Sequence, residues 1–159
     1  MALNPVLLAA VGALLEFLAM ARVLPVQMFG VPRMTSSDAH ETLKGLRVLI
    51  VEDSWQVAAG LKQLLEALGA DVAGPVATSA DAERLISQRV PDVAVVDIHL
   101  RKDDKSYGLI DRLHARGIRT VVITGFSDVS LEPGKADAVL QKPFSEEVLL
   151  AAVRPSTTE

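Results

Sequence analysis

The 159-residue sequence contains no cysteine. This absence excludes a disulfide scaffold, a thiolate metal site and a cysteine nucleophile. The chain also lacks a strong charge excess, because 20 acidic and 16 basic residues give a net charge of -4. A mildly acidic chain gives no electrostatic reason to expect nucleic acid as the main partner. Its length suits one domain with a short extension.

Charged residues are scarce at the start of the chain. Of the first 31 residues, 23 are hydrophobic, and only Glu16 and Arg22 are charged. The apolar run at residues 3–20 is borderline for a membrane-spanning helix, which needs about 20 predominantly apolar residues. A secretory signal is poorly supported, because no Lys or Arg precedes the run and no small-residue cleavage site stands out. If the run did span a membrane, Arg22 and Arg33 would place the following residues in the cytoplasm.

Residues 1–33 therefore keep three interpretations. The first is upstream sequence translated from a start codon assigned too early, or a disordered tail. The second is a helix that binds a membrane or a partner protein. The third is a secretory signal. Residues 34–45 form a polar leader that runs into the domain. We expect membrane contact only if residues 3–20 form a real helix, and otherwise a cytoplasmic protein.

From Gly45 onward, short apolar strand patterns alternate with helical patterns. Asp71–Val76 contains a Gly-Pro pair, which predicts a strand at the edge of a sheet rather than at its centre. Each predicted helix begins at a polar residue and carries an apolar stripe. The predicted strands are Arg47–Val51, Asp71–Val76, 93–96, 120–124 and Ala138–Gln141, and the predicted helices follow Ser54 and cover Ser79–Gln88, 107–116 and 145–153.

Apolar strands that alternate with helices indicate a parallel sheet covered by helices on both faces. Five such units in about 110 residues fit a flavodoxin-like, doubly wound five-stranded α/β fold with strand order 2-1-3-4-5. We expect this domain to cover residues 46–154, with residues 155–159 as a tail. Ligands of such sheets bind outside the carboxyl ends of the strands, so the functional site is expected there.

Polar residues follow four of the predicted strands. Glu52 and Asp53 follow the first strand, Asp97 ends the third, Thr124 ends the fourth, and Lys142 follows the fifth. Clustered carboxylates repel one another unless a cation neutralises them, and oxygen ligands without cysteine favour Mg²⁺ over zinc. A divalent ion beside an aspartate, with a threonine and a lysine opposite, is suited to holding a phosphoryl group. Any one of these residues alone is more often a helix cap or a solvated loop group, so the argument rests on their agreement.

Four segments carry a family resemblance. They read LIVEDS at 49–54, VVDIHL at 95–100, VVITGF at 121–126 and LQKPF at 140–144. In combination they resemble the signature segments of the response regulator receiver domain of two-component signalling, and the resemblance covers residues 46–154.

The resemblance implies that Asp97 accepts a phosphoryl group from a histidine kinase or a histidine phosphotransfer protein. Thr124 and Lys142 would contact that group and pull the following loops into the active state. The bond between Lys142 and Pro143 is expected to be cis.

The resemblance also implies a Mg²⁺ site. Asp53 and Asp97 would bind the ion directly, Glu52 would bind it through water, and the backbone carbonyl of His99 would add a ligand. The side chain of His99 either gates hydrolysis of the acyl phosphate or is simply solvated. Trp55, next to the acidic pair, either reports Mg²⁺ binding by its fluorescence or packs beside the first helix.

Three features depart from the common receiver pattern. The loop after Asp97 lacks the usual proline, and Val139 stands where receivers commonly carry an aromatic switch residue. The segment between Thr124 and Lys142 is short and contains Pro133-Gly134, which predicts a short or irregular fourth helix. Together with the Thr-Gly-aromatic run at 124–126, these features resemble an atypical proteobacterial receiver subgroup.

We expect a phosphoaccepting switch protein rather than an enzyme, and a single-domain regulator, because only five residues follow Arg154. Its output would be protein–protein contact or a phosphate-sink role. One alternative is a Mg²⁺-dependent phosphatase of the haloacid-dehalogenase type with Asp97 as nucleophile. That family needs an acid two residues later, where this chain has His99, and its metal-binding acids follow the nucleophile, whereas Glu52 and Asp53 precede it. The other alternative is a docking module that is never phosphorylated.

Overall fold

The computed structural model describes residues 42–100, 106–125 and 131–154. Three segments considered above therefore lie outside the described residues: the apolar run at 3–20, most of the polar leader and the tail at 155–159. Within the described ranges, no helix is both long enough and apolar enough to cross a membrane.

The sheet has five parallel strands in the order β2-β1-β3-β4-β5, as the sequence predicts. The central strand β3 is buried along its whole length, which explains why its sequence is continuously apolar up to Asp97. The second strand lies at the edge, where the Gly-Pro pair was expected to place it. The strands are β1 (Arg47–Val51), β2 (Asp71–Val76), β3 (Val93–Asp97), β4 (Arg119–Thr124) and β5 (Ala138–Gln141).

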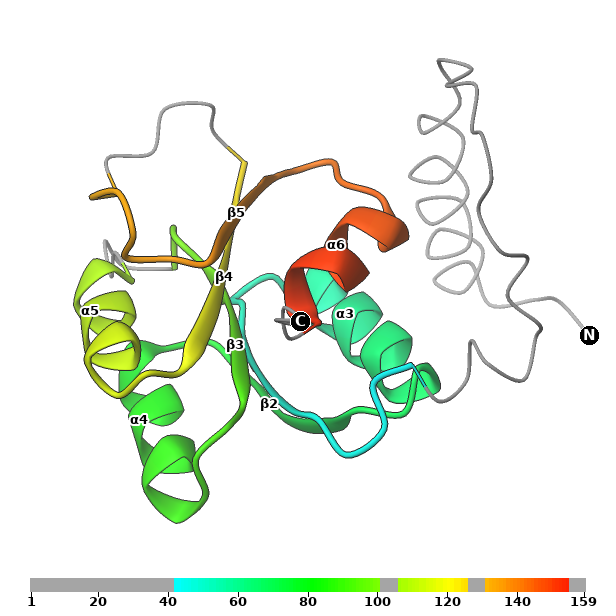
Figure 1. Cartoon of the computed structure of the whole chain (residues 1–159), viewed down its shortest axis with the longest axis horizontal. Helices are drawn as coiled ribbons and strands as arrows, with labels where there is room; N and C mark the ends of the chain where they lie inside the picture. Colours follow the sequence, from blue (N-terminus) through cyan, green and yellow to red (C-terminus); the bar gives the residue numbers. More distant parts are fainter. Residues whose placement is uncertain (1–41, 101–105, 126–130, 155–159) are drawn as a thin grey trace, which may run out of the picture. The chain divides into compact units, whose positions relative to one another are not determined.

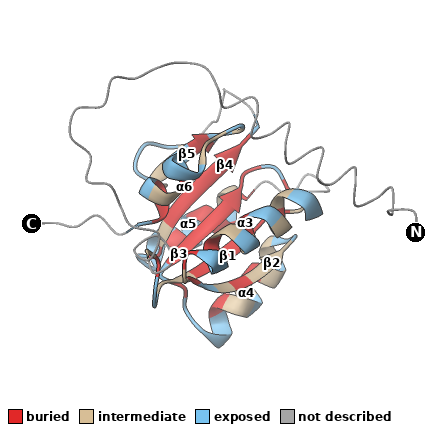
Figure 2. Ribbon diagram, turned by 90° about the vertical axis from the view of Figure 1, so that its right-hand side faces the viewer, coloured by how far each residue is buried: buried red, intermediate tan, exposed pale blue. Residues whose placement is uncertain are grey.

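Helices cover both faces of the sheet. Helices α3 and α6 lie on one face, and α4 and α5 lie on the other (Figure 1). The inner strands β1, β3 and β4 are almost wholly buried, the edge strands β2 and β5 are partly exposed, and the outer sides of the helices are exposed (Figure 2). The helices are α3 (Trp55–Ala67), α4 (Ser79–Gln88), α5 (Tyr107–Ala115) and α6 (Glu146–Val153).

The alternation of side chains along β1 divides the interior into two apolar cores. Val48 and Ile50 join the core that contains residues of α3 and α6, whereas Leu49 and Val51 join the core that contains residues of α4 and α5. Successive side chains of a strand point to opposite faces, so one apolar strand fills both cores. The side chains of β1 are therefore anchored in both cores, and the two acidic residues follow directly after this anchored strand.

The connection between β4 and β5 contains no helix within its described part, residues 125 and 131–137. Instead, Leu131 and Ala136 pack against the core beneath α4 and α5. Gly134 has a φ of 84°, a left-handed conformation that residues other than glycine rarely adopt. This part of the chain confirms the expectation of a short or irregular fourth helix.

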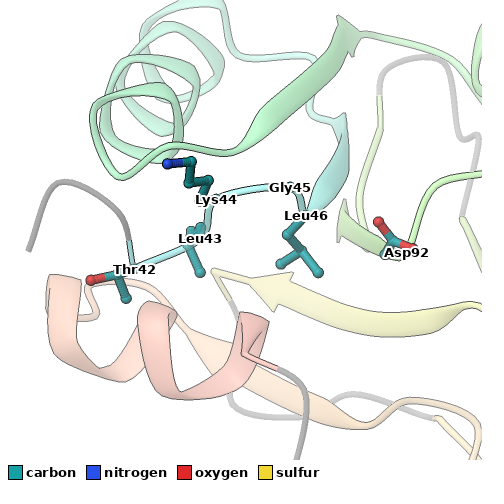
Figure 3. Close-up of a pocket in the computed structure, with 6 residues that line it drawn as sticks. All are labelled: Thr42, Leu43, Lys44, Gly45, Leu46 and Asp92. Atoms are coloured by element: carbon teal, nitrogen blue, oxygen red, sulfur yellow. The ribbon is translucent and has the colours of Figure 1, made fainter. Parts of the chain in front are cut away.

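The segment before β1 belongs to the folded domain. Leu43 is 2% exposed, packs in the core with α3 and α6, and donates its N–H to the carbonyl of Leu68 over 2.8 Å. Leu43 and Leu46 point to one side of this segment and Lys44 to the other, beside a shallow hollow that Asp92 also lines (Figure 3). This hollow lies at the amino ends of β1 and β3, at the opposite edge of the sheet from the acidic residues.

Because Leu43 is buried, a Leu43→Ala variant is expected to lower the free energy of unfolding by about 2–3 kcal/mol through lost burial and a residual cavity. Urea unfolding followed by circular dichroism measures this change. Val90→Ala is the matched control, since Val90 is 61% exposed and its truncation should change stability by less than about 0.5 kcal/mol. Equal stability of the Leu43→Ala variant and the wild-type protein would contradict the placement of Leu43 in the core.

Candidate functional site

Neighbouring strands bring three acidic residues together. Glu52 and Asp53 follow β1, and Asp97 ends β3, which pairs with β1 so that Val51 lies opposite Val96. One carboxylate oxygen from each acid lies within 4.8 Å of the others. The expected convergence of these three carboxylates at the carboxyl ends of the strands is therefore what the structure shows.

Two of the three carboxylates are almost fully removed from solvent. Glu52 is 3% exposed and Asp97 is 6% exposed, while Asp53 is half-buried. Lys142, which follows β5, reaches past β4 and places its Nζ 2.8 Å from Oε2 of Glu52 and 2.6 Å from Oδ2 of Asp97. The lysine was expected at this edge, and its double ion pair shows that the side chain points into the acidic cluster.

Backbone donors orient the same two carboxylates. The N–H of Ser54 donates to Oε1 of Glu52 over 2.9 Å, and the N–H of His99 donates to Oδ1 of Asp97 over 2.9 Å. Ser54 stands at the N-cap position of α3, as predicted, but its side chain makes no capping bond. Each buried carboxylate thus receives one backbone N–H and the Lys142 ammonium, which restricts its rotation.

Burial and pairing change the acid–base behaviour of this cluster. Burial raises the pKa of Glu52 above its usual value, and hydrogen bonds from Lys142 and Ser54 offset only part of this effect. For Lys142, burial acts to lower the pKa, but hydrogen bonds to Asp97 and Glu52 outweigh it and leave the pKa above its usual value. Lys142 therefore keeps its positive charge at neutral pH, whereas burial disfavours the ionised form of Glu52.

These shifts predict how stability depends on pH in the absence of divalent ions. The pKa of Glu52 is raised on folding, so its favourable contribution is complete below the unfolded value of 4.5 and is lost as the pH rises through the higher folded value. Glu52→Gln, which stays neutral, should remove this dependence and raise the Tm at pH 7. Thermal unfolding in EDTA between pH 4.5 and 7 measures both effects. A Glu52→Gln variant with a lower Tm than wild type at pH 7 would contradict the burial argument.

Thr124 and Lys142 are joined through the backbone. Thr124 ends β4 and is 1% exposed, and its carbonyl accepts the N–H of Lys142 over 2.7 Å. This bond continues the β4–β5 pairing by one residue beyond Gln141. The peptide bond between Lys142 and Pro143 is cis, as the resemblance implied. Both residues therefore lie at the same edge of the sheet as the carboxylates.

The donor set fits a hard divalent cation. Three carboxylates lie together with one ammonium group, so the cluster holds more acidic than basic groups. Carboxylate oxygens are the ligands that Mg²⁺ prefers. Glu52, Asp53 and Asp97 are the described residues that could hold such an ion, with Lys142 beside it.

Three other residues considered in the sequence have clear positions. Trp55 is the first residue of α3 and is 77% exposed, so the interpretation that it packs beside the helix is wrong. His99 is also exposed, next to the acidic cluster. Val139, at the position of the usual aromatic switch, is exposed on the edge strand β5.

Sequence reasoning missed one buried residue of the site. Ser106 is fully buried, and its hydroxyl donates to the backbone carbonyl of Asp97 over 2.6 Å. In the sequence it is only the last residue of a polar stretch before α5. A polar residue immediately before an apolar helix was a weak signal, because such residues usually cap helices.

Comparison with known proteins agrees with this geometry. Residues 48–154 match the family model of the response regulator receiver domain. The chain belongs to this family. Its similarity to Protein PilG of Pseudomonas aeruginosa is 29% identity over 117 residues, which cover 69% of this chain and 86% of PilG.

Solved receiver domains have the same fold. The CheY-like receiver domain from Methylobacillus flagellatus is 30% identical, with a TM-score of 0.58 over 67% of this chain and 98% of that one. The CheY-like receiver domain from Methanospirillum hungatei JF-1 is 29% identical, with a TM-score of 0.61 over 68% of this chain and 90% of that one. The protein therefore carries a receiver domain of the two-component response regulators.

Proposed function

We propose that this receiver domain belongs to a response regulator whose Asp97 accepts a phosphoryl group from a histidine kinase or a histidine phosphotransfer protein. The observation that carries the proposal is the contact of 2.6 Å between Nζ of Lys142 and Oδ2 of the buried Asp97, inside a cluster of three carboxylates. A buried aspartate with a cation already beside it is suited to attack an anionic phosphoryl group, because the cation offsets the repulsion between the two anions.

In the proposed reaction, an oxygen of Asp97 forms a bond to phosphorus while the P–N bond of a phosphohistidine breaks. The imidazole leaves with the electron pair of that bond and takes up a proton. Lys142 and Thr124 contact the phosphoryl oxygens as they transfer. The N–H of His99, which already donates to Asp97, holds the carboxylate in place during the attack.

We propose that the reaction depends on Mg²⁺. Asp53 and Asp97 would hold the ion directly, Glu52 would hold it through water, and the carbonyl of His99 would add a ligand. A bound Mg²⁺ supplies positive charge that draws electron density from the phosphoryl oxygens. Glu52 contributes by fixing Lys142, which its Oε2 contacts over 2.8 Å, and by offering a buried carboxylate whose negative charge a bound cation would compensate.

We propose that the protein acts in the cytoplasm. Its phosphorylated form would either bind another protein or serve as a phosphate sink. Val139 provides no aromatic ring to couple to Thr124, and the described part of the β4–β5 connection has no helix. These two features support membership of the atypical receiver subgroup. Signal transmission would then pass through the loops after β4 and β5 rather than through a regular fourth helix.

Incubation with acetyl phosphate tests the proposal most directly. In Mg²⁺, intact-mass spectrometry should show the added mass of one phosphoryl group, and EDTA should prevent its appearance. Release of inorganic phosphate from the donor without a trapped phosphoprotein would support the phosphatase alternative. A protein that neither gains mass nor consumes the donor would support the docking module and overturn the proposal.

A further inference from the structure

Among the described residues, five polar or charged residues are buried, and two of them have no place in the mechanism above. Glu52, Asp97 and Thr124 belong to the site. Thr120 lies at the other end of β4, where its hydroxyl donates to the carbonyl of Ile118 over 3.0 Å. Ser106 is fully buried just before α5, yet its hydroxyl contacts the backbone of the proposed phosphoacceptor.

Ser106 does not use its hydroxyl in the way that its position suggests. It stands at the N-cap of α5, but its side chain caps no N–H of that helix. By contrast, Thr78 accepts the N–H of Asp81 at the start of α4, and Ser145 accepts the N–H of Val148 at the start of α6. A capping bond typically contributes about 1 kcal/mol. Helix α5 lacks that capping bond, and the Ser106 hydroxyl donates to the backbone carbonyl of Asp97 instead.

The contacts of Ser106 hold one particular peptide group. The carbonyl of Asp97 accepts the Ser106 hydroxyl over 2.6 Å, while the N–H of Ile98, in the same peptide group, donates to the carbonyl of Ile123 over 3.0 Å. The N–H of Ser106 also donates to the carbonyl of Ile98 over 3.3 Å. The peptide group that follows Asp97 is therefore fixed at both of its polar ends.

The orientation of this peptide group governs the geometry of the site. It sets the direction in which the Asp97 side chain leaves the strand. The next peptide group, whose Ile98 carbonyl accepts the N–H of Ser106, supplies the N–H of His99 that donates to Oδ1 of Asp97. Ile98 is fully buried and Asp97 nearly so, so water cannot readily replace a hydrogen bond that the Asp97 carbonyl loses.

We infer that Ser106 is a positioning residue, which holds the backbone of Asp97 so that its carboxylate faces the proposed metal and the incoming phosphoryl group. The inference rests on the proposed function of Asp97. Ser106 acts only through the backbone of Asp97 and Ile98 and touches no reacting atom.

The test compares Ser106→Ala with Thr120→Val, which removes an equally buried hydroxyl-to-carbonyl bond at the amino end of the sheet. Both variants should show a lowered Tm. Only Ser106→Ala should slow phosphorylation by acetyl phosphate at saturating Mg²⁺, by roughly tenfold or more, and weaken Mg²⁺ binding in calorimetry by about tenfold. Ser106→Thr, which keeps the hydroxyl, should restore both the phosphorylation rate and the Mg²⁺ affinity.

Unchanged rate and Mg²⁺ affinity in Ser106→Ala would overturn the inference. So would an equal slowing in Thr120→Val, because the effect would then be general destabilisation. If Ser106→Ala does not fold, Ser106→Cys keeps the volume with a weaker donor and should shift both values in the same direction.

Amide hydrogen exchange separates this inference from the proposed function. If wild-type protein takes up no phosphoryl group, the proposed function fails. Faster exchange of the Ile98 N–H in Ser106→Ala than in Thr120→Val would still show that Ser106 fixes this peptide group. Equal exchange at Ile98 in the two variants would overturn the positioning role whether or not the protein is phosphorylated.

Discussion

An Asp97→Asn variant is expected to gain no phosphoryl group from acetyl phosphate in Mg²⁺, under conditions that fully modify the wild-type protein. An uncharged amide oxygen is a far weaker nucleophile than a carboxylate, and no other described carboxylate has Nζ of Lys142 at 2.6 Å. Intact-mass spectrometry over the course of the reaction measures the loss. We expect this to be the largest effect of any single substitution in the site.

Asp92→Asn is the matched control for this experiment. Asp92 lies just before β3, at the amino end of the strand that Asp97 ends, and its Oδ2 accepts the N–H of Arg47 over 2.8 Å. This variant should be phosphorylated at the wild-type rate, because it removes a carboxylate from the opposite edge of the sheet. Modification of the Asp97→Asn variant at the wild-type rate would exclude Asp97 as the acceptor.

Replacing Lys142 by methionine should have the second-largest effect. The variant loses the cation that contacts both Glu52 and Asp97, so two buried carboxylates are left without a charged partner. We expect phosphorylation to slow by about 100-fold, as for loss of one preorganised donor to a transferring group. The time course of phosphoprotein formation at saturating Mg²⁺ measures this change.

Lys142→Met should also make the free energy of unfolding depend more strongly on Mg²⁺ than it does in the wild-type protein. Removing one partner of a buried ion pair costs about 3 kcal/mol, and a bound divalent ion would offset part of that loss. Urea unfolding of Lys142→Met with EDTA and with Mg²⁺ should therefore show a larger stabilisation by Mg²⁺ than in wild-type protein. Lys62→Met is the control, because Lys62 pairs with Glu66 on the exposed side of α3.

Lys142→Arg separates charge from shape. Arginine keeps the positive charge, so stability in EDTA should stay closer to wild type than in Lys142→Met. Its planar fork cannot place a compact charge between Glu52 and Asp97, so phosphorylation should still be slow. Wild-type phosphorylation rates in both variants would show that Lys142 does not contact the transferring group.

Several contacts of the site could not be predicted from the sequence, because they depend on distances between segments that are far apart in the chain. Lys142 and Glu52 are 90 residues apart, and only the arrangement of β5, β4 and β1 in one sheet brings their charges to 2.8 Å. The same holds for Ser106, whose hydroxyl bond to Asp97 depends on how the chain returns to begin α5. Trp55 also illustrates the limit, since a large apolar residue at a helix start can be buried or exposed with the same local pattern.

The amino-acid sequence by itself determined the fold class, the strand order and the set of polar residues at the strand ends. Apolar runs that alternate with helical stripes are local features, and parallel strands must carry their carboxyl ends to one edge. Only the tertiary structure decided which of these groups touch, how far each is buried and which backbone groups hold them. Those properties depend on packing between segments far apart in the chain, and the lack of cysteine left carboxylates, hydroxyls and one lysine to form the site.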